Sequence, residues 1–171
     1  MEFFDVIKSR QSVRRYQDRP VEEEKLRTIL ETAASAPSAG NLQSYEIYVA
    51  RRAVDRNALA QAASGQEFMA SAPIALVFCA NPGHAQPRYG QRLTDLYALQ
   101  DATIACTYAM VAATALGLSS VWIGAFREEQ VQSAIHVQEE VRPVAILAIG
   151  YAGEMPEFTP RREFNDLIHE L

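Results

Sequence analysis

Apolar residues form two kinds of pattern along the chain, and each kind predicts a different element. Short unbroken apolar runs are typical of strands that are covered on both faces. Alternation of apolar and polar positions is typical of a strand with one exposed face. We expect unbroken strands at residues 73–80, 121–126 and 144–152, and an alternating strand at residues 44–50. Because helical segments separate these runs, the chain is predicted to form one central sheet with helices on both faces.

Apolar positions at helical spacing predict the segments between the strands. Helices are expected at residues 2–10, 22–36, 54–63, 93–116 and 127–136, and a loop at residues 81–90. The second helix begins with three glutamates, which suit the positive end of the helix dipole. It has to end before Pro37.

The long helix carries a stripe of small side chains. Its alanines at positions 98, 102, 105, 109 and 112 follow one another at intervals of four and three residues. Such a stripe lets another backbone come close, either the chain's own sheet and a neighbouring helix or a partner subunit. The spacing does not distinguish these two interpretations. Residues 102–126 carry no charge, but Gly117 and two serines interrupt them, so we expect a buried helix and a buried strand instead of a membrane span.

Composition narrows the class of protein. A chain of 171 residues with 49% apolar and 22% charged residues fits one globular domain, residues 1–171. The net charge of −5 disfavours a general nucleic-acid binder. Cys79 and Cys106 lie in apolar runs and are interpreted as core residues in a reducing compartment. The first ten residues lack the apolar core of a signal peptide, which favours the cytoplasm.

No familiar catalytic constellation is present in the sequence. His84, His136 and His169 lie far apart in unlike contexts, and each is interpreted as a surface or capping residue. There is no zinc-protease, dithiol, nucleophile-elbow or phosphate-loop motif, and the glycines do not form a dinucleotide-binding fingerprint. We therefore predict no catalytic side chain and no metal site.

A basic patch follows the first helix. Arg10, Ser12 and Arg14 alternate, so in an extended segment they would point to the same side. Two guanidinium groups and a hydroxyl on one side form a suitable phosphate site, since arginine offers a planar fork of donors. The alternative is a solvated basic turn.

A second patch, residues 36–43, links a helix to a strand. Loops at such junctions often line ligand sites, and its small residues would let a flat ligand approach the backbone. Asn41 and Gln43 could bind an amide-like heterocycle, because a side-chain amide both donates and accepts hydrogen bonds. The alternative is a plain turn that ends the helix.

Five motifs in a fixed order resemble the FMN-dependent nitroreductase family, and the resemblance runs from about residue 4 to residue 169. They are Arg10-x-Ser12-x-Arg14, the segment 36–43 (APSAGNLQ), Gln100-Asp101 opening the alanine-rich helix, the segment 122–126 (WIGAF), and Ile149-Gly150-Tyr151 followed by Arg161. The resemblance implies an α+β fold with a mixed central β-sheet flanked by helices on both faces. It also implies a homodimer with FMN at the subunit interface. Neither nucleic acid nor a membrane is expected as a partner.

The resemblance implies two features of that dimer. The alanine stripe would form its close-packed core. A domain-swapped C-terminal arm, residues 164–169, would cross to the partner and add a short strand.

The resemblance also implies residue roles at the flavin. The cofactor-binding residues would be Arg10, Gln11, Ser12, Arg14, Pro37, Ser38, Ala39, Asn41, Gln66, Gly124, Ala125 and Arg161. Arginines 10 and 14 with Ser12 resemble the phosphate and ribityl contacts, and Arg161, in preference to Arg162, the third basic contact. The segment 37–41 would come from the other subunit. The backbone at 124–125 would face flavin N5, and Gln66 would lie near the pyrimidine edge.

Some positions depart from the family pattern. Ser44-Tyr45 stands where Pro-Trp is common, and Gly65, Gln66 and Phe68 stand where larger members carry a Lys/Asn pair. A cation at the pyrimidine end would then have to come from an arginine such as Arg88 or Arg92. The segment 83–93 is short, which predicts a small and open cover over the active site.

The resemblance implies that hydride passes from NADH or NADPH through FMN to a small acceptor, such as a nitroaromatic, a quinone or a flavin, in a ping-pong cycle. Two alternatives stay open. One is a flavin protein of the same fold that dehalogenates its substrate or fragments flavin. The other is a non-catalytic metabolite-binding domain.

Overall fold

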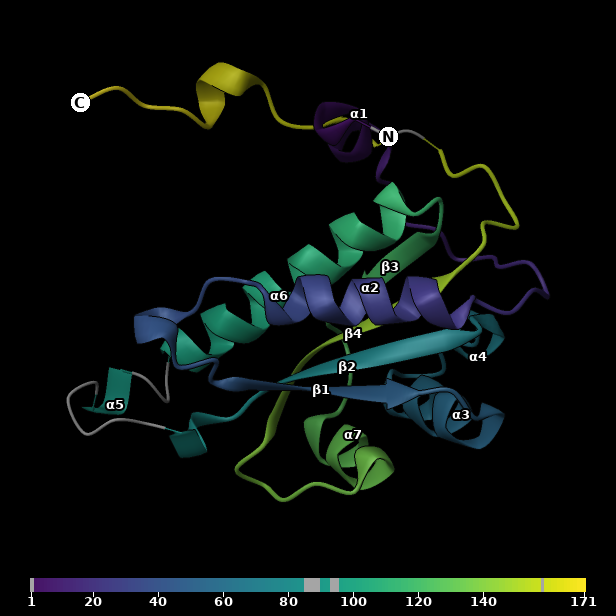
Figure 1. Cartoon of the computed structure of the whole chain (residues 1–171), viewed down its shortest axis with the longest axis horizontal. Helices are drawn as coiled ribbons and strands as arrows, with labels where there is room; N and C mark the ends of the chain where they lie inside the picture. The colour runs from purple at the N-terminus through teal and green to yellow at the C-terminus, as the bar shows by residue number, and fades with distance from the viewer. Residues whose placement is uncertain (1, 85–89, 93–95, 158) are drawn as a thin grey trace.

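The fold is built on one four-stranded sheet (Figure 1), in a computed structural model that describes residues 2–84, 90–92, 96–157 and 159–171. The strands are β1 (Tyr45–Ala50), β2 (Ile74–Ala80), β3 (Ser119–Ile123) and β4 (Arg142–Gly150), in the order β1-β2-β4-β3. Neighbouring strands pair antiparallel. Among the described residues, parallel pairing is confined to an isolated bridge between Ser12 and Ser120. The predicted α+β class is confirmed, but the expected mixed sheet is not: the four strands pair antiparallel throughout, and the parallel bridge lies outside them.

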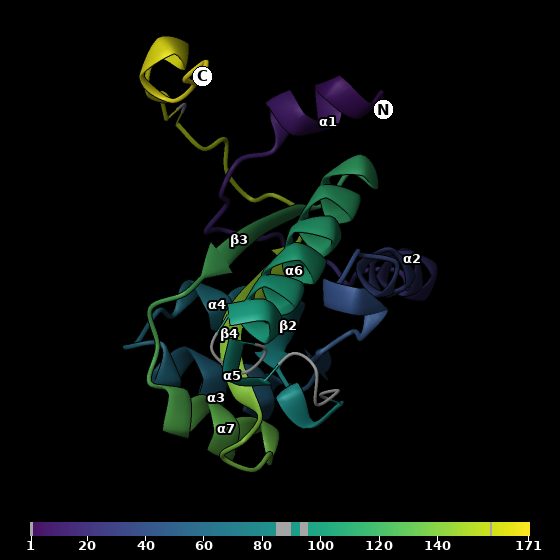
Figure 2. The same cartoon turned by 90° about the vertical axis from the view of Figure 1, so that its left-hand side faces the viewer.

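Helices cover both faces of the sheet, as the sequence predicts (Figures 1 and 2). The described helices are α1 (Phe3–Ser9), α2 (Glu23–Ala34), α3 (Ala53–Ala62), α4 (Phe68–Ser71), α5 (Gly90–Arg92), α6 (Ala98–Ala115) and α7 (Glu128–Ile135). Helices α2 and α6 pack on one face, and α3, α4 and α7 on the other. Short 3-10 turns lie at Ala39–Asn41, Pro82–His84 and Phe164–Asp166.

Strand β2 separates two hydrophobic cores. All seven of its residues are buried. Because successive side chains of a strand point to opposite faces, Val77 and Cys79 join the core under α3 and α7, whereas Leu76 and Phe78 join the core under α2 and α6. Because both faces of this strand are buried, its sequence is an unbroken run of apolar residues.

Several predicted boundaries differ from the structure; the strand expected at residues 144–152, for example, is β4 at Arg142–Gly150. The strand expected at residues 121–126 occupies Ser119–Ile123, because its two serines pair with the end of β4 and the chain leaves the sheet after Ile123. The long helix is described as Ala98–Ala115, and residues 93–95, where its start is expected, lie outside the described part of the chain. The expected loop at 81–90 is described only in part, and Arg88 is not among its described residues.

The alanine stripe of α6 packs inside its own chain. Ala98, Ala102, Ala105 and Ala109 are fully buried and Ala112 is nearly so. Helix α6 contacts α2 and all four strands. The prediction that this stripe forms the dimer core is therefore wrong: the small side chains bring α6 close to its own sheet.

Both cysteines are buried and free. Burial raises the pKa of the Cys79 thiol to about 12 and also raises the pKa of Cys106 well above its usual value. In this environment both thiols act as small apolar core residues. Within the described part of the chain, no helix is both long and apolar enough to cross a membrane.

Because the alanine stripe is buried against the sheet, replacing one of its alanines with a large residue should destabilise the fold. Ala105→Trp should destabilise the folded chain by about 3 kcal/mol or more, because the larger ring has to enter a packed interface. The control change Thr28→Trp, on the exposed side of α2, should leave unfolding almost unchanged. Urea denaturation of both variants measures the difference. Equal stability of the two would contradict the placement of the stripe.

Candidate functional site

The basic patch lies beside β3, an edge strand of the sheet. Ser12 bridges to Ser120, and the Val13 N–H donates to the Ser120 carbonyl at 3.2 Å. Val13 and Tyr16 are buried and anchor the segment, and the Tyr16 hydroxyl donates to a carbonyl of β4. Between these anchors, Ser12 is half-buried and Arg14 is exposed. The segment is extended here, as the phosphate-site interpretation requires.

Glu154 fixes this segment from behind. Its Oε1 accepts hydrogen bonds from the backbone N–H groups of Arg14, at 2.6 Å, and Arg15, at 3.1 Å. The Gly153 N–H donates to the Arg15 carbonyl at 2.7 Å. A Cβ at Gly153 would lie 3.0 Å from the Tyr16 backbone, so a side chain there would be crowded. Sequence reasoning missed Glu154, because its partners are backbone groups about 140 residues earlier in the chain.

Unpaired guanidinium groups mark the basic patch. Most described arginines bond to an acidic side chain, a tyrosine hydroxyl or a carbonyl; these are Arg19, Arg27, Arg51, Arg52, Arg56, Arg92, Arg142, Arg161 and Arg162. Within the described residues, the side chains of Arg10, Arg14, Arg15 and Arg127 form no hydrogen bond or ion pair. Arg10 and Arg14 lie in the basic patch, and Arg15 follows it directly. The donor set therefore fits an anion with several oxygen acceptors, such as a phosphate.

The backbone at 124–125 lies past the other end of β3. Gly124 and Ala125 are exposed, and the Gln66 Nε2 donates to the Ala125 carbonyl at 3.3 Å. The basic patch adjoins the start of β3, and five strand residues span about 16 Å. One edge of the sheet thus offers cationic donors at one end and open backbone at the other. This separation suits an elongated ligand with an anionic tail.

The loop at 37–43 lies away from this edge. Pro37, Ser38 and Ala39 line a cavity of about 570 Å³ together with residues of the N-terminal end of α6. Arg10 and Gln11 line a smaller cavity, of about 110 Å³, together with Thr114 from the C-terminal end of α6. Asp101 and Thr114, which lie at these two ends, are separated by about 20 Å along the helix axis. Within one chain, the loop and the basic patch do not meet.

The loop has an unusual backbone. Gly40, Asn41 and Gln43 adopt positive φ angles of 57°, 58° and 46°. The Gln43 Nε2 donates to the Ser38 Oγ at 3.2 Å and to the Asn41 Oδ1 at 2.7 Å. The amide N–H groups of Gln43 are thus engaged inside the loop, which differs from the expectation that they could bind a heterocycle.

The third expected basic contact lies in the C-terminal tail. Arg161 and Arg162 donate to the tail carbonyls of Thr159 and Asp166, each at 2.8 Å. The tail passes the basic patch at Pro156, which lines the small cavity with Arg10. The structure of one chain brings Pro156, but neither tail arginine, into the lining of that cavity.

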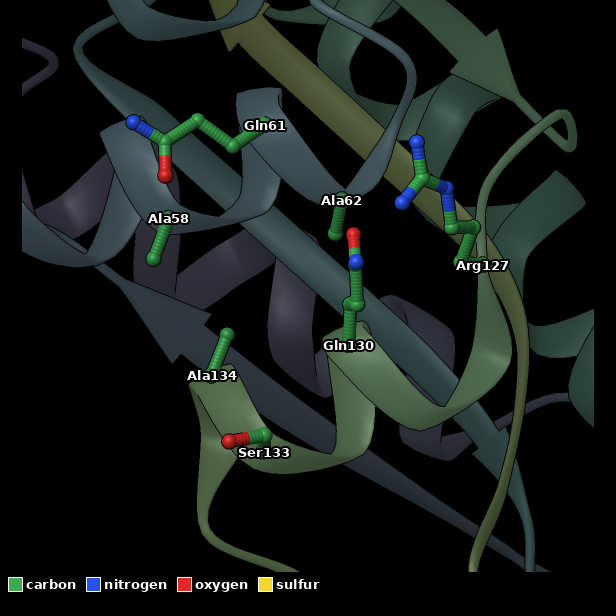
Figure 3. Close-up of a pocket in the computed structure, with 7 residues that line it drawn as sticks. All are labelled: Ala58, Gln61, Ala62, Arg127, Gln130, Ser133 and Ala134. Atoms are coloured by element: carbon green, nitrogen blue, oxygen red, sulfur yellow. The ribbon is translucent and has the colours of Figure 1, made fainter.

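A further cavity, of about 430 Å³, opens between α3 and α7 (Figure 3). Gln61 lines it from α3, and Arg127 and Gln130 line it from the N-terminal end of α7. The Arg127 N–H donates to the Ala62 carbonyl at 2.9 Å, which ties the two helices together. This cavity was not expected from the sequence, since its lining residues come from two separate helices.

Comparison with known proteins identifies relatives across the whole fold. The nitroreductase family model matches residues 7–66 and 55–151. The chain is 30% identical to a putative NADH dehydrogenase/NAD(P)H nitroreductase of Archaeoglobus fulgidus, over 98% of this chain and 97% of the relative. It is 31% identical to an FMN reductase (NAD(P)H) of Bacillus subtilis, over 97% of this chain and 73% of the relative.

A solved structure shares the fold. The NADPH:FMN oxidoreductase of Vibrio harveyi, complexed with NAD+, superposes with a TM-score of 0.90 at 27% identity, covering 98% of this chain and 76% of that one. The family match spans both the basic patch and the backbone at 124–125. On this evidence the chain belongs to the nitroreductase family.

Proposed function

We propose that this chain is an FMN-dependent oxidoreductase that passes hydride from NADH or NADPH to a small acceptor, such as a nitroaromatic, a quinone or a flavin, in a ping-pong cycle. The observation that carries the proposal is the set of unpaired arginines beside the edge strand β3, which ends in open backbone. Family membership and relatives named as FMN reductase and NADPH-flavin oxidoreductase support it.

The residues of one edge have distinct tasks in this proposal. Arg10, Arg14 and the Ser12 hydroxyl bind the phosphate and the ribityl chain of FMN. When bound, FMN supplies the acceptance and release of hydride. The N–H groups of Gly124 and Ala125 donate to the flavin ring near N5, and Gln66 orients this backbone through the Ala125 carbonyl. Arg161 adds a third positive charge near the phosphate.

We propose that the working unit is a homodimer, because the flavin site is incomplete in one chain. The expected flavin loop, Pro37–Asn41, lies about 20 Å along α6 from the basic patch, so a second chain has to bring its own loop to that patch. Apolar side chains are exposed on α1 and on the tail, among them Phe3, Phe4, Phe164 and Ile168. Large exposed apolar groups of this kind mark an interface.

The partner surface comprises the outer side of α6 and the tail. Thr103, Thr107 and Tyr108 are exposed along α6 in a segment without charge. The tail, residues 164–169, extends away from the sheet (Figure 1). We propose that it crosses to the partner as an exchanged arm. We also propose that residues 1–171 form one domain and that the protein works in the reducing cytoplasm, which its two free thiols support.

The function is tested by anaerobic reduction. Purified protein with FMN should show flavin absorption bands, and NADH or NADPH should bleach them before an acceptor restores them. A preparation that binds FMN but is reduced by neither nucleotide would contradict the oxidoreductase proposal and favour another flavin role. A preparation that does not bind FMN would favour a non-catalytic binding domain.

Removing the phosphate donors should weaken FMN binding. Arg10→Ala combined with Arg14→Ala removes two charge-assisted contacts, each of about 1.5–3 kcal/mol, so Kd should rise by a factor of about 100 or more. Fluorescence titration of apoprotein measures Kd. The control Arg27→Ala with Arg52→Ala removes the same charge from arginines paired to surface acids and should leave Kd unchanged. Wild-type affinity in the first variant would place the phosphate elsewhere.

A charge on the outer side of α6 should separate the subunits. Thr107→Arg buries a cation in the proposed interface, so light scattering after gel filtration should show monomers that remain folded. Thr28→Arg is the matched control, since both threonines are exposed and each Oγ1 donates to the carbonyl four residues earlier. An intact dimer of Thr107→Arg would refute this interface.

A further inference from the structure

A buried carboxylate holds both ends of the expected flavin loop. Asp101 lies in the first turn of α6 and is 2% exposed. Its Oδ1 accepts a hydrogen bond from the Ala39 N–H at 2.9 Å, and its Oδ2 accepts one from the Ser44 N–H at 3.4 Å. One side chain thus connects two backbone positions of the loop, one near its start and one directly after its end, to helix α6.

The loop needs such an external support. Asn41 and Gln43 are non-glycine residues with positive φ, a conformation that costs free energy and persists only where surrounding contacts enforce it. The other side-chain bonds of the loop join it to itself, as where the Gln43 N–H donates to the Ser38 Oγ at 3.0 Å. The Asp101 carboxylate instead joins it to α6.

The hydrogen bonds that the Asp101 carboxylate accepts constrain the position of the loop. Burial of a carboxylate is costly unless hydrogen bonds or an opposite charge compensate it. Among the described residues Asp101 forms no ion pair, and its partners are backbone N–H groups, with added support from the N-terminal dipole of α6. Because backbone donors have fixed directions, this bonding defines where Ala39 and Ser44 lie relative to α6.

We propose that Asp101 is a positioning residue for the flavin site of the partner subunit. It does not touch the flavin. It fixes the loop that presents Pro37, Ser38, Ala39 and Asn41 across the interface, whereas the basic patch of its own chain serves the other flavin. The inference rests on the proposed function, and it adds that one residue acts in trans.

The first test is Asp101→Asn, which keeps the shape of the side chain but turns an NH₂ group toward one of the two N–H donors. In apoprotein, the Ala39 and Ser44 amides should lose hydrogen-exchange protection while β2 keeps it. The Kd for FMN should rise at least tenfold. Ile146→Val, a core change on the opposite face of the sheet, should lower the melting temperature without raising Kd. If Asp101→Asn does not fold, Asp101→Glu, which displaces the carboxylate by one methylene, takes its place.

The second test mixes defects between subunits. A heterodimer of an Asp101→Asn chain with an Arg10→Ala/Arg14→Ala chain, purified through two different tags, has one site with an intact basic patch and an intact loop. The other site carries both defects. We expect one tight FMN per heterodimer, with wild-type Kd, although each parent homodimer binds weakly.

Two results would overturn the inference while the proposed function stands. Either the Asp101→Asn homodimer binds FMN as tightly as wild type, or the heterodimer has no tight site, which would mean that Asp101 acts within its own chain. Failure of the wild-type protein to bind FMN would instead overturn the proposed function, and this inference with it.

Discussion

The close packing of α6 on the sheet is the constraint on which the rest of the structure depends. Because its buried alanines are small, this helix of 18 residues lies close to the strands. It runs through the hydrophobic core that α2 also covers. The basic patch adjoins its C-terminal end, and the loop at 37–43 adjoins its N-terminal end. The helix acts as a spacer of about 20 Å between the loop and the basic patch, and the proposed dimer rests on that separation.

Two carboxylates fix the backbone of the two segments that are proposed to bind the flavin. Glu154 holds the N–H groups of Arg14 and Arg15, and Asp101 holds those of Ala39 and Ser44. In both cases an acidic side chain from one segment fixes the backbone of another, which leaves the side chains of that backbone free to face a ligand. Positioning of this kind suits an enzyme whose reactive chemistry belongs to its cofactor.

Much of the fold could be predicted from the sequence, because the spacing of apolar residues along the chain shows which side chains are buried. The unbroken run of β2 and the helical spacing of Leu26 and Ile29 correspond to side chains that are fully buried in the structure. The alanine stripe was assigned to the wrong partner, since spacing shows that a helix face is close-packed but not what packs on it. Strand β3 begins at Ser119, two residues before the predicted start at residue 121. Its two serines pair with β4 through their backbone, so an apolar pattern does not mark them.

The cofactor-binding residues, among them Arg10, Ser12 and Arg14, and their division between two subunits follow from the family resemblance and stay predictions. The contacts of Glu154 and Asp101 were not predicted, because they join distant segments that no local pattern reports. The composite site is tested most directly by a crystal structure of the protein with FMN. We predict the phosphate against Arg10 and Arg14 of one subunit and the flavin ring against Pro37–Asn41 of the other. A flavin held by the patch and the loop of one chain, or bound away from both, would contradict it.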